Sequence, residues 1–211
     1  MSFFSLDSKF MQALSRIADL ILLNLVFLVT CIPIFTIGAA SAALYSVAFR
    51  LGTEREEGVF RCYFRAFRNN FKQGTILFLV LLLPCLLLIF SVFFYSALDG
   101  AAHLFTYLCV ALLVVMTLIY GYVFPLLSQF CNSVKQTLKN ALLLSIGYLP
   151  RSLAIAVLNV LPAAVFYYQT MFFFQIGLLW ILLYFSAAAY INARILRKVF
   201  APYQETGEEN P

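Results

Sequence analysis

The sequence predicts an all-α, polytopic integral membrane protein, and three observations carry this prediction. Of the 211 residues, 64% are hydrophobic and only 11% are charged, whereas soluble domains are roughly half apolar and a quarter charged. The mean hydropathy is +0.94. Five apolar segments recur along the chain, and most are long enough to cross a hydrocarbon core of about 30 Å. A soluble protein of this length could not bury so many large side chains.

The first hydrophobic segment covers residues 20–49 and is interrupted between Pro33 and Gly38. An unbroken helix of this length would cover about 45 Å, well beyond the hydrocarbon core. Pro33 removes a backbone donor, Thr36 is expected to cap a new helix, and Gly38 tolerates unusual backbone angles. These residues predict a helix break, either as one kinked crossing or as two half-helices in a re-entrant hairpin.

An amphipathic segment follows the first hydrophobic segment. It carries one stripe of phenylalanines and, one residue later at the same spacing, one stripe of basic residues: Phe60, Phe64, Phe67 and Phe71, then Arg61, Arg65, Arg68 and Lys72. On a helix the two stripes lie about 100° apart. Such a helix is expected to lie flat on the cytoplasmic face, with Phe at the acyl boundary and Arg near lipid phosphates. Phe-rich faces also fit grooves on other proteins, so these eight residues are candidates for lipid or partner docking.

The remaining segments complete a single helical membrane domain over residues 1–198. Residues 75–98, 103–127, 152–168 and 176–193 are hydrophobic, and residues 132–144 form a second amphipathic helix on the cytoplasmic face. That helix has Val134, Leu138, Ala141 and Leu142 on one side. Overlay of the two amphipathic segments indicates a weak parallel repeat of residues 59–125 and 126–193, as transport folds often have. Residues 199–211 read as a short acidic disordered tail.

The basic residues predict the topology. They gather in three regions, whereas the connections around residues 99–100 and 169–175 have none. The positive-inside rule therefore places the basic regions and the C-terminus in the cytoplasm and the two bare loops outside. For the first segment, charge favours the hairpin, which puts every basic residue on one side. Length favours one tilted, kinked crossing, because each half is short of about 20 residues, and we favour this single crossing.

Polar groups inside the membrane are the remaining candidates for function. Asn24 and Asn159 lie within hydrophobic segments, where Asn most often bonds a neighbouring helix and otherwise marks a pathway. Small residues spaced by four at Gly38, Ala39, Ala42 and Ala43 predict close helix packing. The sequence contains no catalytic triad, paired carboxylates or phosphate loop, and its single His and scattered Cys offer no metal site. We therefore expect no enzyme, no cofactor and no nucleic-acid partner.

Several short motifs together resemble a known family. They are Pro33-Ile34-Phe35-Thr36-Ile37-Gly38-Ala39, Ala42-Ala43-Leu44-Tyr45, Phe64, Phe67, Asn70-Phe71-Lys72-Gln73, Thr137-Leu138-Lys139-Asn140-Ala141 and Leu149-Pro150-Arg151. Their order along nearly the whole chain resembles the YesL-like family of bacterial membrane proteins of unknown function. Genes of that family often accompany carbohydrate ABC-importer and glycoside-degradation genes. The resemblance therefore implies a multi-pass protein of the bacterial cell membrane with a link to sugar uptake, and it carries over no binding residues.

Two functions follow as expectations. The first is a non-enzymatic accessory membrane protein that works with a carbohydrate ABC importer, or with a sensor beside it, and docks through the Phe and Arg stripes. The alternative is a small autonomous transporter or facilitator built on the broken first helix and the repeat. No carboxylate lies midway along a hydrophobic segment, which counts against a proton-driven mechanism.

Overall fold

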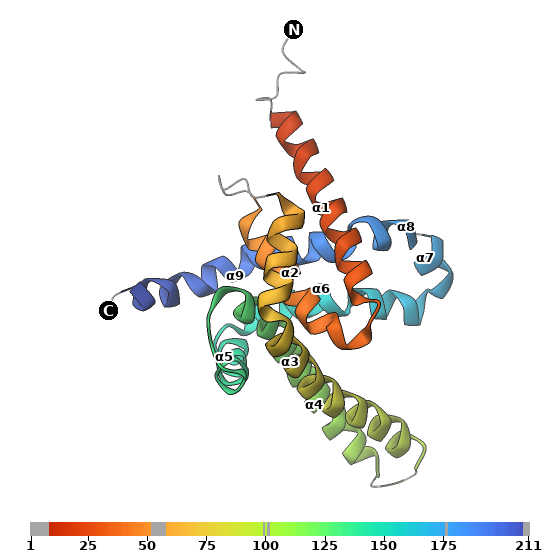
Figure 1. Cartoon of the computed structure of the whole chain (residues 1–211). Coiled ribbons are helices and arrows are strands. Elements are labelled where there is room, and N and C mark those ends of the chain that lie inside the picture. Colours follow the sequence, from red (N-terminus) through yellow and green to blue (C-terminus); the bar gives the residue numbers. More distant parts are fainter. Residues whose placement is uncertain (1–8, 52–57, 99, 101, 176, 209–211) are drawn as a thin grey trace.

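The computed structural model describes residues 9–51, 58–98, 100, 102–175 and 177–208, and every element in these ranges is helical (Figure 1). Five of the described helices are long and apolar enough to cross a membrane. They are Ala13–Cys31, Val59–Ser96, His103–Gln129, Leu149–Tyr168 and Gly177–Tyr203. The prediction of an all-α polytopic membrane protein with five hydrophobic segments is therefore confirmed.

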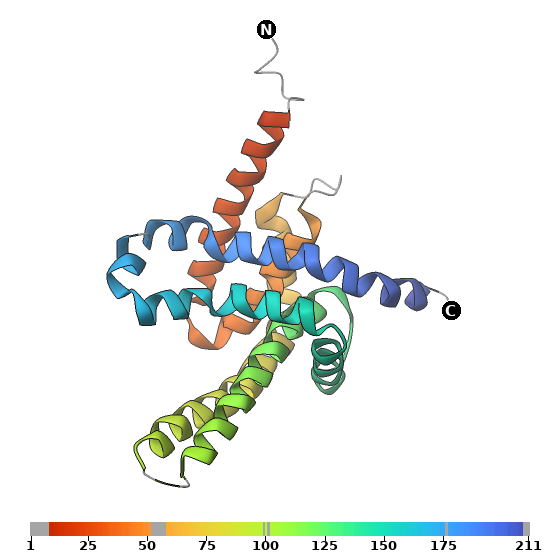
Figure 2. The ribbon, with the colours of Figure 1, turned by 180° about the vertical axis from the view of Figure 1, so that it is seen from behind.

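The first hydrophobic segment forms a hairpin. Helix α1 (Lys9–Cys31) is followed by a 3₁₀ turn, η1 (Ile34–Thr36), and by α2 (Ile37–Arg50). The chain reverses at η1, and α2 runs back toward the end of the molecule where α1 begins (Figures 1 and 2). The single kinked crossing that length favoured is therefore wrong. The reason is that α1 starts at Lys9 rather than near residue 20, so its 23 residues alone span about 35 Å.

Helix α2 lies at the centre of the fold. Every residue from Gly38 to Phe49 is buried, and α2 contacts α1, α3, α4 and α9. Its small residues allow close approach, as the sequence predicted. A Cβ built on Gly38 would lie 2.1 Å from the Gly74 carbonyl oxygen of α3, and one built on Gly74 would lie 2.8 Å from the Ala39 Cα. Gly38 therefore allows the backbones of α2 and α3 to come into direct contact.

Helix α3 (Val59–Ser96) is a single helix of 38 residues that returns as α4 (Ala102–Gln129). The first amphipathic segment, predicted as a separate flat helix, is instead the beginning of α3. Nothing breaks the helix between this segment and the membrane span, because Gly74 packs tightly against α2 and so stays helical. The α3–α4 hairpin projects from the centre of the molecule in both views (Figures 1 and 2).

The second half contains α5 (Val134–Gly147), α6 (Leu149–Tyr168), α7 (Thr170–Gln175), α8 (Gly177–Leu179), the π-helical turn η2 (Trp180–Tyr184) and α9 (Phe185–Glu208). Helix α5 is the second amphipathic helix. Its buried residues are Thr137, Ala141, Leu144 and Ser145, and of the predicted side Val134 and Leu138 also pack against the core, whereas Leu142 is exposed. Residues 199–208 are helical instead of a disordered tail, because Val199 and Phe200 pack into the core. Residues 209–211 lie outside the described ranges, and the internal repeat stays a prediction.

Candidate functional site

The eight predicted docking residues lie on the beginning of α3, and we call them the Phe/Arg face. Phe60 and Phe64 are each 49% exposed and Phe71 is 39% exposed. Arg61, Arg65, Arg68 and Lys72 are exposed as well. Phe67 is half-buried and packs between Tyr63 and Phe71, with ring centroids 6.3 and 5.5 Å away. Both stripes therefore point away from the bundle, apart from Phe67.

The side of α3 that does enter the core is a different one, formed by Cys62, Tyr63 and Ala66. Tyr63 is fully buried, and its hydroxyl lies 2.6 Å from the Thr30 Oγ1 of α1. The sequence predicted that the Phe stripe faces lipid or a partner, and no pattern in it indicated that Tyr63 enters the core. In a membrane protein an apolar stripe can face lipid or a partner as readily as the core, so spacing alone did not separate the two sides.

The helix break at Pro33 is held by a short hydrogen-bond network. The Thr36 hydroxyl donates to the carbonyls of Thr30 at 2.5 Å and Pro33 at 2.6 Å. Thr36 occupies the N-cap position of α2 as expected, but its side chain makes no capping bond to an N–H of that helix. It satisfies carbonyls that α1 leaves unpaired at its C-terminus instead. Through Thr30, this network connects the break to Tyr63 of α3.

Asn24 joins the first membrane helix to the last one. Its side-chain nitrogen donates to the carbonyls of Trp180 at 3.2 Å and Ile181 at 2.6 Å, and its side-chain oxygen accepts from the Ser186 N–H at 2.8 Å. The two carbonyls belong to the π-helical turn η2, and Ser186 follows directly after it. The fully buried Asn24 amide therefore binds the backbone at this turn. It fits the helix-bonding interpretation rather than a pathway.

Asn159 belongs to a buried polar layer between α2, α6 and α9. The Asn192 side-chain nitrogen donates to the Tyr45 hydroxyl at 3.2 Å and to the Asn159 Oδ1 at 3.3 Å. Asn192 is fully buried, and its Oδ1 has no hydrogen-bond partner. Gly121 of α4 lies beside this layer, since a Cβ there would be 3.7 Å from the Asn159 Nδ2. The orphaned oxygen is a costly feature inside a bundle unless a polar molecule meets it.

Two further connections were not anticipated from the sequence. The Arg197 guanidinium of α9 donates to the Phe49 carbonyl at the C-terminal end of α2, where a cation offsets the helix dipole. The Ser152 hydroxyl lies 2.9 Å from the Tyr122 hydroxyl and donates to the Ser145 carbonyl at 2.8 Å, which ties α4, α5 and α6 together. No local pattern marks either pair, because their members lie far apart in the sequence.

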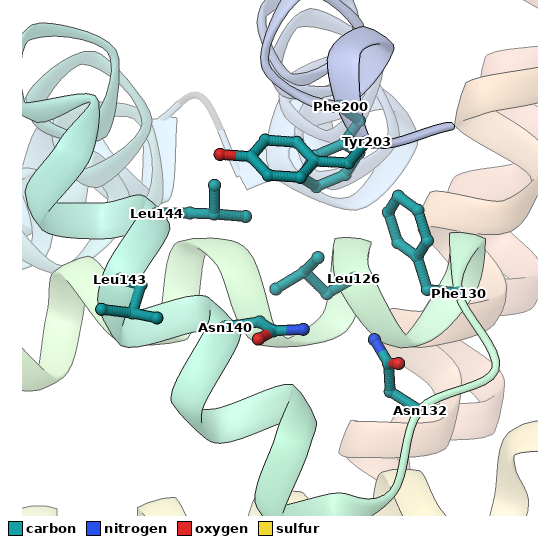
Figure 3. A pocket seen from close by; sticks show the side chains of 8 residues that line it. All are labelled: Leu126, Phe130, Asn132, Asn140, Leu143, Leu144, Phe200 and Tyr203. Carbon is teal, nitrogen blue, oxygen red and sulfur yellow. The ribbon is translucent and has the colours of Figure 1, made fainter. Parts of the chain in front are cut away.

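A pocket of about 290 Å³ opens between the end of α4, helix α5 and the end of α9. Among the side chains that the structure describes, those that line it are all uncharged: Leu126, Phe130, Asn132, Asn140, Leu143, Leu144, Phe200 and Tyr203. Figure 3 shows the amides of Asn132 and Asn140 on one side of the gap and the rings of Phe200 and Tyr203 on the other. No local sequence pattern indicates this pocket, since its polar residues come from separate elements.

Metal-ligating side chains do not gather in the part of the chain that the structure describes: no group of three or more His, Cys, Asp or Glu lies together there. The polar layers and the pocket described above are built from amides, hydroxyls and aromatic rings. Such groups bind and orient other molecules.

Comparison with known families matches residues 20–92 to a family described as a protein of unknown function, DUF624. DUF624 is the family of YesL-like proteins, so the match confirms the resemblance drawn from the motifs. The matched part contains most of α1, the break, α2, the Phe/Arg face and most of α3. No curated protein and no solved structure matches the chain.

Proposed function

Starting from this similarity to a membrane-protein family of unknown function, we propose that the protein is a non-enzymatic accessory subunit of a sugar-uptake system in the bacterial cell membrane. Its partner is a carbohydrate ABC importer or a sensor beside it, and it docks through the Phe/Arg face. The sugar link rests on the resemblance alone. The docking role rests on one observation, namely the exposure of the Phe/Arg face on a helix that continues unbroken into the membrane.

The continuity of α3 favours a protein partner over a lipid anchor. A helix of 38 residues is about 57 Å long, which exceeds the hydrocarbon core by roughly 27 Å. A helix that anchors to lipid lies in the membrane plane, with its apolar stripe in the acyl boundary. The beginning of α3 extends the transmembrane axis instead, so Phe60 and Phe64 project beyond the acyl boundary. Exposed Phe beside Arg is typical of the central residues of protein interfaces.

Replacing arginine with lysine tests this docking role. Arg61→Lys and Arg68→Lys together keep both charges but remove the planar, forked contacts that only arginine makes. Arg65 already has an interaction within the chain, so it is left unchanged. We expect the double variant to recover at least about fivefold less importer after mild-detergent purification from native membranes. If the face only anchors the helix to lipid, the variant should bind the membrane almost as well as the native chain, because Lys and Arg contribute about equally at an anionic surface.

The matched control is Arg194→Lys, because the exposed Arg194 contacts Tyr190 of its own helix and lies outside the Phe/Arg face. It should recover the importer as the native chain does. Equal recovery by the double variant, at equal membrane abundance, would contradict docking through this face. Mass spectrometry of the co-purified membrane proteins identifies the partner, and the absence of any importer component would contradict the sugar-uptake assignment.

A second candidate, an autonomous facilitator, is favoured by the buried polar layer of Tyr45, Asn159 and Asn192. The orphaned Asn192 Oδ1 could line part of a polar route across the bundle. Proteoliposomes loaded with the purified chain would then take up radiolabelled neutral solutes faster than empty vesicles. Asn192→Leu should abolish this uptake if the layer is the route. Uptake equal to that of empty vesicles would remove this candidate.

A further inference from the structure

We infer that the pocket between α4, α5 and α9 binds a small, neutral, hydroxylated ring compound of monosaccharide size. This binding site is separate from the Phe/Arg face and does not depend on it. The inference rests on the shape of the pocket, its lack of charge, and the pairing of amides with aromatic rings.

The size of the pocket limits its occupant. A volume of about 290 Å³ lies at the lower end of the range for ligand sites, so the pocket fits one ring rather than an extended chain. Asn132, Asn140 and Tyr203 are partly exposed, which gives the ligand a way in from the surface. The exposed Lys135 and Lys139 of α5 place this end of the molecule on the side predicted to be cytoplasmic.

The walls of the pocket are held in place by the surrounding fold. Phe200 is almost completely buried and packs edge-on against Phe130, with ring centroids 5.5 Å apart. The connection that carries Asn132 is fixed by a bond from its own N–H to the Phe130 carbonyl at 3.0 Å. Just beyond it, Ser133 caps α5 by accepting from the Gln136 N–H. The pocket is therefore formed before any ligand arrives, which lowers the entropic cost of binding.

The side-chain amides of Asn132 and Asn140 are available to a ligand. They lie next to each other on one wall of the pocket (Figure 3), and neither makes a side-chain hydrogen bond within the described part of the chain. Each amide offers two donors and one acceptor, which matches the mixed character of neighbouring hydroxyl groups. The rings opposite them, from Phe200 and Tyr203, would face the C–H side of the same compound.

The uncharged character of the described lining disfavours the competing ligands. A phosphate or carboxylate entering this pocket would lose hydration and meet no cation among the described lining residues. A purely apolar occupant, such as an acyl chain, would leave both amides without partners. A ring compound with hydroxyls on its edge and an apolar face satisfies both walls at once.

Ligand-observed NMR with the full chain in phospholipid nanodiscs tests the inference, because no sugar-headed detergent then competes. The probes are glucose, galactose, xylose, rhamnose and myo-inositol, with glucose 6-phosphate and glucuronate as charged counterparts. We expect saturation transfer to at least one neutral probe and none, or at least about tenfold weaker binding, for its charged counterpart. The absence of transfer to every neutral probe, or stronger binding of the charged ones, would overturn the inference.

Asn132→Leu and Asn140→Leu keep the approximate size of both side chains and remove their hydrogen bonds. Together they should weaken binding of the neutral probe at least about tenfold. The control is Gln136→Leu, which removes an exposed amide of the same helix that does not line the pocket, and it should bind normally. Thermal unfolding confirms that all variants are folded. Undiminished binding in a folded double variant would overturn the site, whereas importer recovery through the Phe/Arg face tests the proposed function separately.

Discussion

Gly38 and Gly74 show how much the fold depends on single residues. Each occupies a place where one added carbon would collide with backbone of the other helix. Backbone cannot move aside as a flexible side chain can, so any larger residue must push α2 and α3 apart. Because α2 is buried along its length, that separation would disturb its contacts with α4 and α9 as well.

Gly38→Ala should therefore destabilise the protein by about 1–3 kcal/mol, the usual cost of overpacking. Gly147→Ala is the matched control, because a Cβ at Gly147 meets nothing within 4 Å at the end of α5. It should be neutral or stabilising by up to about 1 kcal/mol. Unfolding of both variants in the same detergent, measured by circular dichroism, gives the comparison. Equal stability of the two would contradict the close contact between α2 and α3.

At the scale of elements, α3 combines two parts that the sequence presented as separate. Its amphipathic beginning and its apolar remainder differ sharply in composition, and this difference suggested a bend near residue 74. Composition reports what surrounds a helix, whereas its direction is set by packing, here of Tyr63 and Gly74 against α1 and α2.

A distance across α3 distinguishes the straight helix from the bent one. Spin labels at Phe60 and Phe93, both exposed, should lie about 50 Å apart on a straight helix, less a few ångströms for a kink at Pro84. A right-angle bend at Gly74 would bring them to about 35 Å. The measurement is pulsed electron resonance on a cysteine-free chain carrying the two label sites. A distribution centred on the shorter distance would restore the flat amphipathic helix.

The sequence was sufficient for the positions of the long helices but not for their polar partners. Hydropathy located all five spans because burial in lipid demands unbroken apolar stretches. Asn24 was recognised because an amide inside a span needs a partner. Its partner is a π-helical turn more than 150 residues later in the chain, and no local sequence pattern indicates this pairing. The pocket was missed for the same reason, since Asn132, Asn140 and Tyr203 meet only in the folded chain.

At the scale of the whole molecule, the hairpin of α1 and α2 resolves the conflict between length and charge. Because α2 runs back toward the beginning of α1, the start of α1 and the end of α2 lie on the same side of this hairpin (Figures 1 and 2). The positive-inside rule then predicts that this side faces the cytoplasm, since basic residues flank both ends.

This topology predicts a specific labelling pattern in intact cells. A membrane-impermeant thiol reagent should modify Gly100→Cys and spare Phe3→Cys and Pro211→Cys, in a background without native cysteines. Permeabilised cells supply the control, because all three positions should then react. Modification of Phe3→Cys from outside would indicate a single crossing of the first segment after all.

The bonds of Asn24 also have a consequence for biosynthesis. The last membrane helix leaves the ribosome long after the first, yet the carbonyls of Trp180 and Ile181 accept hydrogen bonds from Asn24 of α1. Until the two ends of the chain meet, the Asn24 amide lacks these bonds within the bilayer, where no water replaces them. The last step of assembly should therefore be a slow one, in which the first membrane helix packs against the last. In a nascent chain stalled before residue 180, a crosslinker at position 24 should react with the insertion machinery. Once the full chain is released from the ribosome, this crosslink should no longer form.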